Sequence, residues 1–186
     1  MRLFFALDIP ANIREQVIWA RQELARDVWG VKWVEDHNLH LTMKFLGEVP
    51  EPKLKEIAAA ARTATEGLKS FSLSVGGPGY FPNARNPRVI WLAINDPQSG
   101  AVRVGHNLDD SLVPLGFEPE KRRQLHLTLG RIKNDAATAA LLQNGRSFTG
   151  FKGMLSFIVN ELVLYRSELS RHGPSYFAME KFELIG

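Results

Sequence analysis

The chain has 186 residues, of which 45% are hydrophobic and 23% charged, a composition typical of a globular protein rather than a disordered or fibrous one. The 23 Lys and Arg residues exceed the 20 Asp and Glu residues by only three charges, so the balance permits a polyanionic partner without requiring one. Cysteine is absent, which excludes disulfides, thiol nucleophiles, Cys-ligated zinc and iron–sulfur clusters. The apolar run 3–7 is too short for a signal-peptide core or a membrane span, and we expect a reduced, cytoplasmic setting.

In chain order, we expect a strand at 2–8, a helix at 11–27, strands at 31–34 and 39–46, a helix at 52–68 and a strand at 71–75 that the following glycines end. The second half is expected to contain a strand at 89–94, a helix at 101–115, a strand at 125–132, a helix at 135–143, a long strand at 155–165 and a closing strand at 175–184. The helices are predicted from apolar residues at a 3.6-residue period, such as Ile13, Val17, Ala20 and Leu24.

One tetrapeptide occurs twice. HLTM at 40–43 returns as HLTL at 126–129, a shift of 86 positions, and similar strands and helices flank both copies. The repeat predicts two pseudo-symmetric α+β lobes around a central cleft, each an antiparallel sheet with helices on its outer face. We expect one bilobal domain, 1–186, made of duplicated halves at roughly 1–80 and 88–186, with strands exchanged between the lobes.

The repeated tetrapeptide points to acid–base chemistry. Alternate residues of a strand share a face, so His40 and Thr42, like His126 and Thr128, should face the cleft while the intervening apolar residues anchor the strand. Histidine donates or accepts protons near neutral pH, and two histidines at one centre suit displacement at phosphorus without a metal. Threonine hydroxyls and a nearby cation would then hold the phosphate oxygens.

The cation is harder to assign from the sequence. Strand parity places Lys44 on the same face as His40 and Thr42, whereas it places Arg131 out of phase with the second motif. Parity therefore favours Lys44, although Gly130 could relax the strand and turn Arg131 inward. The loop residues Arg85 and Arg88 are further candidates.

Simpler interpretations apply to several other residues. A zinc site at His40 and His126 lacks a third ligand at suitable spacing, so we expect no metal and no cofactor. His37 and His106 fit surface or helix positions, and His172 fits a loop position, with contact to a ligand as the alternative. The basic run 121–123 fits a solvated turn, or a patch that steers an RNA end towards the cleft. Phe45 and Phe81 could each stack on a base or belong to the core.

At these residues the sequence resembles the 2H phosphoesterase superfamily, and more closely the RNA 2′,3′-cyclic phosphodiesterases, historically called 2′-5′ RNA ligases. The resemblance covers essentially the whole chain. It is carried by RLFFAL at 2–7, HLTMKFLG at 40–47, FPNARNPRVIW at 81–91, HLTLGRI at 126–132 and ELVLYRSEL at 161–169. One departure is Leu125, where the family often has proline.

This resemblance implies a metal-independent enzyme that opens a terminal 2′,3′-cyclic phosphate of RNA to a 2′-phosphomonoester. It implies that His40 is the proton donor and His126 the proton acceptor, and that Thr42 and Thr128 hold the phosphate. It also implies that Arg131 contacts the phosphate, against the parity argument, and that Phe45 contacts the base.

Two alternative functions stay open at this point. One is the reverse reaction, 2′-5′ ligation of RNA, and the other is an RNA-end binding module with little turnover. The expected partner is RNA with a 2′,3′-cyclic phosphate end, with tRNA fragments among the candidates. We expect no membrane association and a monomer.

Overall fold

The computed structural model describes residues 1–171 and 173–185. Its elements are β1 (Arg2–Asp8), α1 (Ala11–Leu24), β2 (Val31–Trp33), β3 (His40–Glu48), α2 (Leu54–Thr65), β4 (Phe71–Phe81), β5 (Val89–Asn95), α3 (Gly100–Leu112), β6 (His126–Ile132), α4 (Ala136–Ser147), β7 (Leu155–Val159), β8 (Glu161–Ser170) and β9 (Gly173–Glu183). Short 3₁₀ turns lie at Asp36–Asn38, Glu51–Lys53 and Val113–Leu115.

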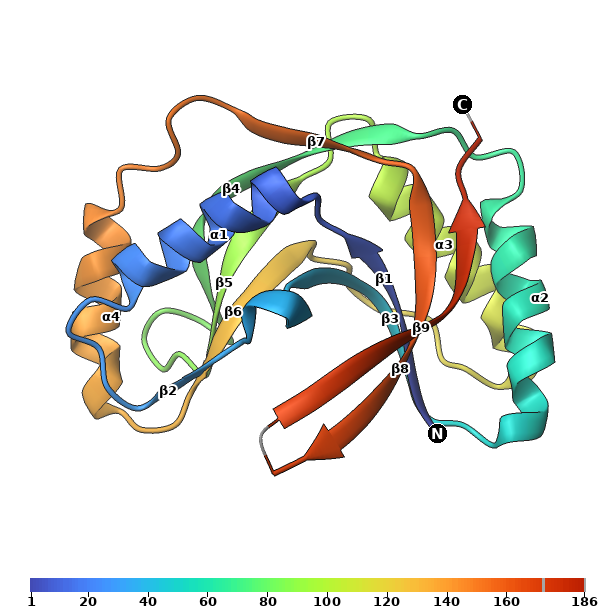
Figure 1. Ribbon diagram of the computed structural model, residues 1–186, viewed down its shortest axis with the longest axis horizontal. Coiled ribbons are helices and arrows are strands. Elements are labelled where there is room, and N and C mark those ends of the chain that lie inside the picture. The colour runs from blue at the N-terminus through green and yellow to red at the C-terminus, as the bar shows by residue number, and fades with distance from the viewer. Residues whose placement is uncertain (172, 186) are drawn as a thin grey trace.

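The strands form one curled antiparallel sheet in the order β7-β4-β5-β6-β3-β1-β8-β9, with β2 paired to β6 (Figure 1). The two strands that carry the repeated tetrapeptide, β3 and β6, are neighbours at the middle of this order. They meet through one residue pair, Leu41 opposite Leu127, and both leucines are fully buried. The sheet therefore brings the two motifs together at its centre.

Helices cover the two ends of the curled sheet. At one end α1 packs against α4 and β7, and at the other α2 packs against α3 and β9 while α3 contacts β3 (Figure 1). The apolar stripe predicted for α1 is confirmed, since Ile13, Val17, Ala20 and Leu24 are all buried. The predicted α+β class, with antiparallel strands, outer helices and a central cleft, is also confirmed.

The glycines after residue 75 do not end a strand, contrary to the prediction. β4 continues to Phe81 and pairs with β5 on both sides of a register shift between Val75 and Pro78. Gly79 is needed there for close packing, because a Cβ atom at this position would lie 2.2 Å from the ring of Trp91. Gly79 therefore allows close contact between strands rather than a turn.

The long strand predicted at 155–165 is two strands. β7 pairs with β4, whereas β8 pairs with β1 at the other end of the sheet. Only Asn160 separates them, and its carbonyl accepts a hydrogen bond of 2.8 Å from the amide of Leu184. A continuous apolar pattern cannot reveal this switch because both strands have buried residues.

Candidate active site

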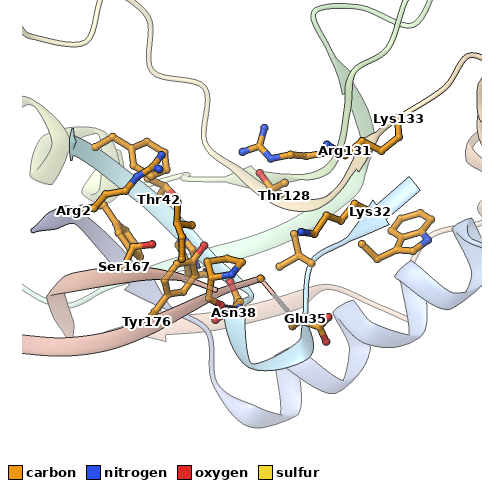
Figure 2. A pocket seen from close by; sticks show the side chains of 18 residues that line it. Arg2, Lys32, Glu35, Asn38, Thr42, Thr128, Arg131, Lys133, Ser167 and Tyr176 are labelled. Carbon is orange, nitrogen blue, oxygen red and sulfur yellow. Dashed lines mark hydrogen bonds between the residues drawn. The ribbon is translucent and has the colours of Figure 1, made fainter. Parts of the chain in front are cut away.

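A cavity of about 560 Å³ lies where β3 meets β6 (Figure 2). Its lining comes from elements far apart in the chain: Arg2 and Phe4 of β1, Lys32 and Trp33 of β2, His40, Thr42 and Phe45 of β3, Thr128 and Arg131 of β6, Ser167 and Leu169 of β8, Gly173, Pro174 and Tyr176 of β9, and Val34, Glu35, Asn38 and Lys133 beside them. The predicted site residues His40, Thr42, Thr128, Arg131 and Phe45 are therefore gathered at one cavity. His126 and Lys44 are not among its lining residues.

A β-bulge in each motif strand decides which side chains face the cavity. In β3, Thr42 lies opposite Ala6 but Lys44 lies opposite Phe5, so Met43 is an extra residue. In β6, Thr128 lies opposite Trp91 but Gly130 lies opposite Ile90, so the second bulge falls at Leu129. Because a bulge reverses the alternation of side chains, the residue three positions after each threonine joins its face.

The two residues brought to the cavity by these bulges are Phe45 and Arg131. They occupy equivalent positions in the two copies, and both line the cavity. Phe45 is 58% exposed and its ring centroid lies 5.7 Å from that of Phe4. The parity argument that placed Arg131 out of phase is thus wrong, and its guanidinium points across the cavity in Figure 2.

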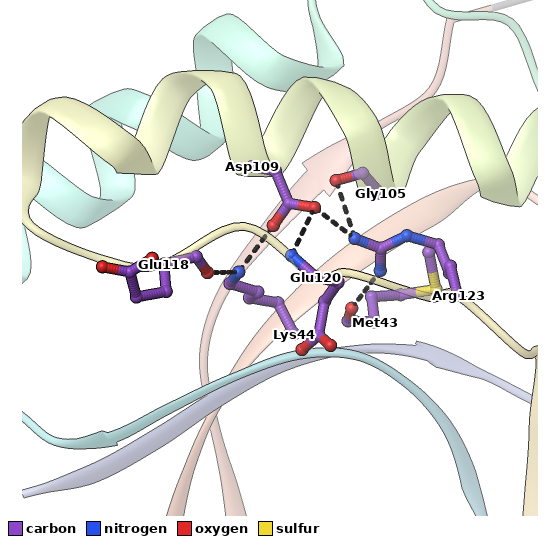
Figure 3. Close-up of polar contacts among 7 residues, drawn as sticks. All are labelled: Met43, Lys44, Gly105, Asp109, Glu118, Glu120 and Arg123. Carbon is purple, nitrogen blue, oxygen red and sulfur yellow. Dashed lines mark hydrogen bonds and ion pairs between the residues drawn. The ribbon is translucent and has the colours of Figure 1, made fainter.

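The same bulge buries Lys44, so the prediction that it faces the cleft is also wrong. Lys44 is 3% exposed, and its ammonium donates to Oδ1 of Asp109 on α3 at 2.5 Å and to the carbonyl of Glu118 (Figure 3). Arg123 donates to Oδ2 of Asp109 at 2.7 Å. Lys44 is therefore part of a buried ion cluster and cannot contact a ligand in the cavity.

Arg123 also corrects the surface-turn interpretation of the basic run 121–123. Its guanidinium turns inward and donates to the carbonyl of Met43 at 2.5 Å, whereas Lys121 and Arg122 are exposed. Burial alone would raise the pKa of Asp109, but the hydrogen bonds and charges of Lys44 and Arg123 and the amide of Glu120 outweigh it and lower the pKa. Arg123 thus holds the carbonyl of the bulged residue in β3.

Each of the two motif histidines is held by the backbone carbonyl two residues before it. Nδ1 of His40 lies 2.7 Å from the carbonyl oxygen of Asn38, and Nδ1 of His126 lies 2.7 Å from that of Gln124. A carbonyl oxygen can only accept, so each Nδ1 carries the proton and each Nε2 is the atom that gains or loses one. Nε2 of His40 lies 2.9 Å from the hydroxyl of Thr42.

The surroundings of the two rings differ. The ring of His40 lies 4.9 Å from Phe4 and 5.2 Å from Tyr176, centroid to centroid. The ring of His126 meets the edge of Phe81 at 4.9 Å and lies 6.0 Å from Trp91. Burial lowers the pKa of His40 below its ordinary value, and the charge of His126 adds to this effect, whereas Asp8 opposes it.

Several residues around His40 were missed by the sequence analysis. Asn38, which is 4% exposed, donates from its side-chain amide to the carbonyl of Pro174 at 2.7 Å and so ties β9 to the residue that orients His40. The hydroxyl of Tyr165 lies 2.8 Å from both carboxylate oxygens of Asp8. Burial and this carboxylate raise the pKa of Tyr165, which keeps it a hydrogen-bond donor. These residues belong to other elements, and no local signal marks them.

The other histidines lie away from the cavity or outside the described residues. His37 and His106 are exposed, as predicted, and His172 lies outside the described residues. Within residues 1–171 and 173–185, no three His, Asp or Glu side chains are grouped so that they could hold a metal ion. No helix in this part of the chain is long and apolar enough to cross a membrane.

The two halves of the chain each match a known family model. The model described as LigT-like phosphoesterase matches the chain twice, at residues 7–91 and 93–176, so each match contains one His-x-Thr motif. The chain belongs to the LigT-like phosphoesterase family. Within this family, curated relatives named RNA 2′,3′-cyclic phosphodiesterase include one from Methanothermobacter thermautotrophicus, 36% identical over 99% of both chains. Another from Archaeoglobus fulgidus is 37% identical over 98% of this chain and all of the relative.

Solved structures of similar proteins agree with this assignment. A crystal structure of a protein from Thermus thermophilus matches with a TM-score of 0.85 at 32% identity, covering 100% of this chain and 99% of the other. The structure of Escherichia coli LigT complexed with 3′-AMP matches with a TM-score of 0.79 at 30% identity, covering 98% and 97%. This LigT-like phosphoesterase therefore shares its whole fold with these proteins.

Proposed function

We propose that this LigT-like phosphoesterase hydrolyses the terminal 2′,3′-cyclic phosphate of RNA to a 2′-phosphomonoester by general acid–base catalysis, with His40 as proton donor and His126 as proton acceptor. The main support is the meeting of two matched His-x-Thr strands at the pair Leu41–Leu127, with each Nδ1 bonded to a carbonyl and each Nε2 left for proton transfer. The name shared by the relatives supports the same substrate.

In the proposed reaction, Nε2 of His126 removes a proton from water while the water oxygen attacks phosphorus. The bond between phosphorus and the 3′ oxygen breaks, and Nε2 of His40 donates its proton to that oxygen. The phosphate stays on the 2′ oxygen, and exchange with solvent restores the starting protonation of both rings. Each acid or base contributes on the order of 10²–10⁴-fold to the rate.

The other site residues then hold the phosphate and the base. Thr42 and Thr128 place hydroxyls in the cavity, with that of Thr42 next to Nε2 of His40, and Arg131 supplies a cation for the non-bridging oxygens as negative charge develops. Phe45, exposed next to Phe4, offers an aromatic face to the terminal base. Lys44 has no role in this proposal, because its ammonium is held by Asp109.

The protonation of His40 links substrate binding to pH. Burial lowers the pKa of His40 in the free protein, yet a proton donor must carry its proton when the substrate is bound. A phosphate anion next to the ring favours the charged form, so binding should bring a proton with it near neutral pH. Calorimetry of 2′-phosphate product binding, in buffers of different ionisation enthalpy, measures this proton uptake.

The decisive experiment is hydrolysis of a short RNA with a 2′,3′-cyclic phosphate end, followed by identification of the product. We expect a 2′-phosphate, loss of on the order of 10²-fold or more in kcat for His40→Ala and for His126→Ala, and normal turnover for His106→Ala, a matched change at an exposed histidine on α3. Activity should survive exhaustive chelation. A 3′-phosphate product, or normal turnover in either motif variant, would contradict the mechanism.

The proposal also covers the direction of the reaction, the oligomeric state and the RNA substrate. By microscopic reversibility the same histidines would catalyse 2′-5′ ligation, and the product analysis distinguishes ligation, hydrolysis and binding without turnover. We propose that the protein acts as a monomer, since His40, Thr42, Thr128 and Arg131 already meet at one cavity within a single chain. Sedimentation at assay concentration tests this. tRNA fragments are candidate substrates, to be compared with other RNAs that carry the same cyclic end.

A further inference from the structure

Three cationic side chains line one side of the cavity without an ion-pair partner. They are Lys32, Arg131 and Lys133, and Figure 2 shows them together, opposite Arg2 and Ser167. None of the three forms an ion pair with another residue in the described part of the chain, and Glu35 is the one carboxylate among the cavity residues. This side of the cavity therefore carries uncompensated positive charge.

The backbone holds these charges close together. β2 pairs with β6 so that Lys32 lies directly opposite Arg131, while the neighbouring Val31 and Trp33 pack against the core. Lys133 follows Arg131 by two residues, one position past the end of β6, and both line the cavity. The amide of Lys133 donates to the carbonyl of Gly30 at 2.7 Å, so the pairing continues to this point.

This arrangement is unfavourable in the absence of a ligand. Like charges directly opposite one another in adjacent strands destabilise a sheet. On strands β8 and β9, by contrast, Arg166 pairs with Glu168 and Lys181 pairs with Glu161, each at 2.7 Å. An anion with more than one negative charge would remove the repulsion between Lys32 and Arg131 and would also reach Lys133.

The cavity is also divided chemically. The position equivalent to Arg131 in the first motif is Phe45, which lies beside Phe4, so the β3 side presents aromatic rings next to Arg2, whereas the β6 side presents three cations. In the proposed function Arg131 serves the reacting phosphate and the aromatic side serves the terminal base. Lys32 and Lys133 are then left without a role in the hydrolysis of a single nucleotide.

We propose that Lys32 and Lys133 form a binding site for a second phosphate, the phosphodiester immediately 5′ to the terminal nucleotide of the RNA. The inference rests on the proposed function, because it takes the cyclic phosphate to lie at the histidines. Lys32 lies directly opposite Arg131 and Lys133 follows it by two residues, so both are next to the cation assigned to the reacting phosphate. The preferred substrate is then an oligonucleotide rather than a nucleoside 2′,3′-cyclic phosphate.

The test compares two substrates with the same terminal nucleoside. We would measure kcat/KM for adenosine 2′,3′-cyclic phosphate and for the dinucleotide ApA with a 2′,3′-cyclic phosphate end. The dinucleotide should be preferred on the order of ten-fold at low salt, and this preference should decline as salt is added. The double variant Lys32→Gln/Lys133→Gln should lose the preference, whereas Lys55→Gln, the same change at an exposed lysine of α2 outside the cavity, should keep it.

A neutral linkage separates charge from the added base. In one ApA substrate a methylphosphonate, which is uncharged, replaces the internal phosphate. With the wild-type chain this substrate should have a kcat/KM as low as that of the unmodified dinucleotide with the double variant. Hydrolysis of both natural substrates with equal kcat/KM, or an undiminished preference in the double variant, would overturn the second phosphate site and leave the proposed function intact.

Failure of the proposed function gives a different result. If neither cyclic substrate is hydrolysed by the wild-type chain, calorimetric affinities for the corresponding 2′-phosphates, adenosine 2′-phosphate and ApA 2′-phosphate, still test the site. Tighter binding of the dinucleotide that depends on Lys32 and Lys133 would support the site, and equal affinity would overturn it.

Discussion

Replacing Asp109 with asparagine should strongly destabilise the protein, because its carboxylate neutralises two buried cations at once. Asp109 accepts from Lys44 at 2.5 Å and from Arg123 at 2.7 Å, and the exposed fractions of the three side chains are 6%, 3% and 9%. Asparagine has nearly the same shape but no charge. In the Asp109→Asn variant, two desolvated cations would face a neutral amide.

The size of the effect follows from the burial of the cluster. Removing one partner of a buried ion pair costs about 3–5 kcal/mol of the free energy of unfolding, because the remaining charge stays desolvated. Lys44→Met should cost less, about 1–3 kcal/mol, because Arg123 still neutralises Asp109 and only one of its oxygens loses a donor. Lys55→Met on the exposed face of α2 is the control, with an expected change within about 0.5 kcal/mol.

Urea unfolding at pH 7 measures these losses, and the hydrolysis assay on the same samples tests the role of Lys44. The Lys44→Met variant should keep its activity under conditions where it is folded, because Lys44 does not reach the cavity. A loss below about 1 kcal/mol for Asp109→Asn would refute the argument from burial. A folded Lys44→Met chain without activity would restore Lys44 as a ligand-binding residue.

Other substitutions test the site from different directions. Because burial lowers the pKa of His40, the unfolded chain binds a proton at this histidine more readily than the folded protein does, so the free energy of unfolding should decrease as the pH falls below about 6.5. The His40→Gln variant should flatten this dependence in urea titrations at pH 7.5 and 5.5. An unchanged slope would argue against His40 as the source of the dependence. Thr42→Val should lower kcat by about 10²-fold, because the threonine hydroxyl lies 2.9 Å from Nε2 of His40, and Thr42→Ser, which keeps a hydroxyl, should have normal kcat. Full activity of the valine variant would exclude this contact from the reaction. Gly79→Ala should cost about 1–3 kcal/mol in thermal or urea unfolding, because its Cβ would lie 2.2 Å from Trp91, and a neutral effect would mean that the ring can move.

Much of the fold could be predicted from local pattern. The buried stripe of α1 follows from spacing alone, because a helix of 3.6 residues per turn turns Ile13 and Val17 to the same side. The expected strand at the second motif agrees with β6 to within one residue at its start. The repeated tetrapeptide indicated that the histidine and threonine of each copy share a face, because regular alternation holds as far as each bulge.

What lies beyond the threonines was decided only by tertiary structure. Strand parity assumes regular alternation, but the bulge at Met43 depends on pairing with β1 and on Arg123, which comes from a distant loop. That one extra residue moved Lys44 from the expected cavity position into a buried ion cluster, and its counterpart in β6 turned Arg131 inward. Residue type and period were thus enough to predict that each histidine shares a face with its threonine, whereas the placement of the cations depended on contacts between segments that the chain brings together only when it folds.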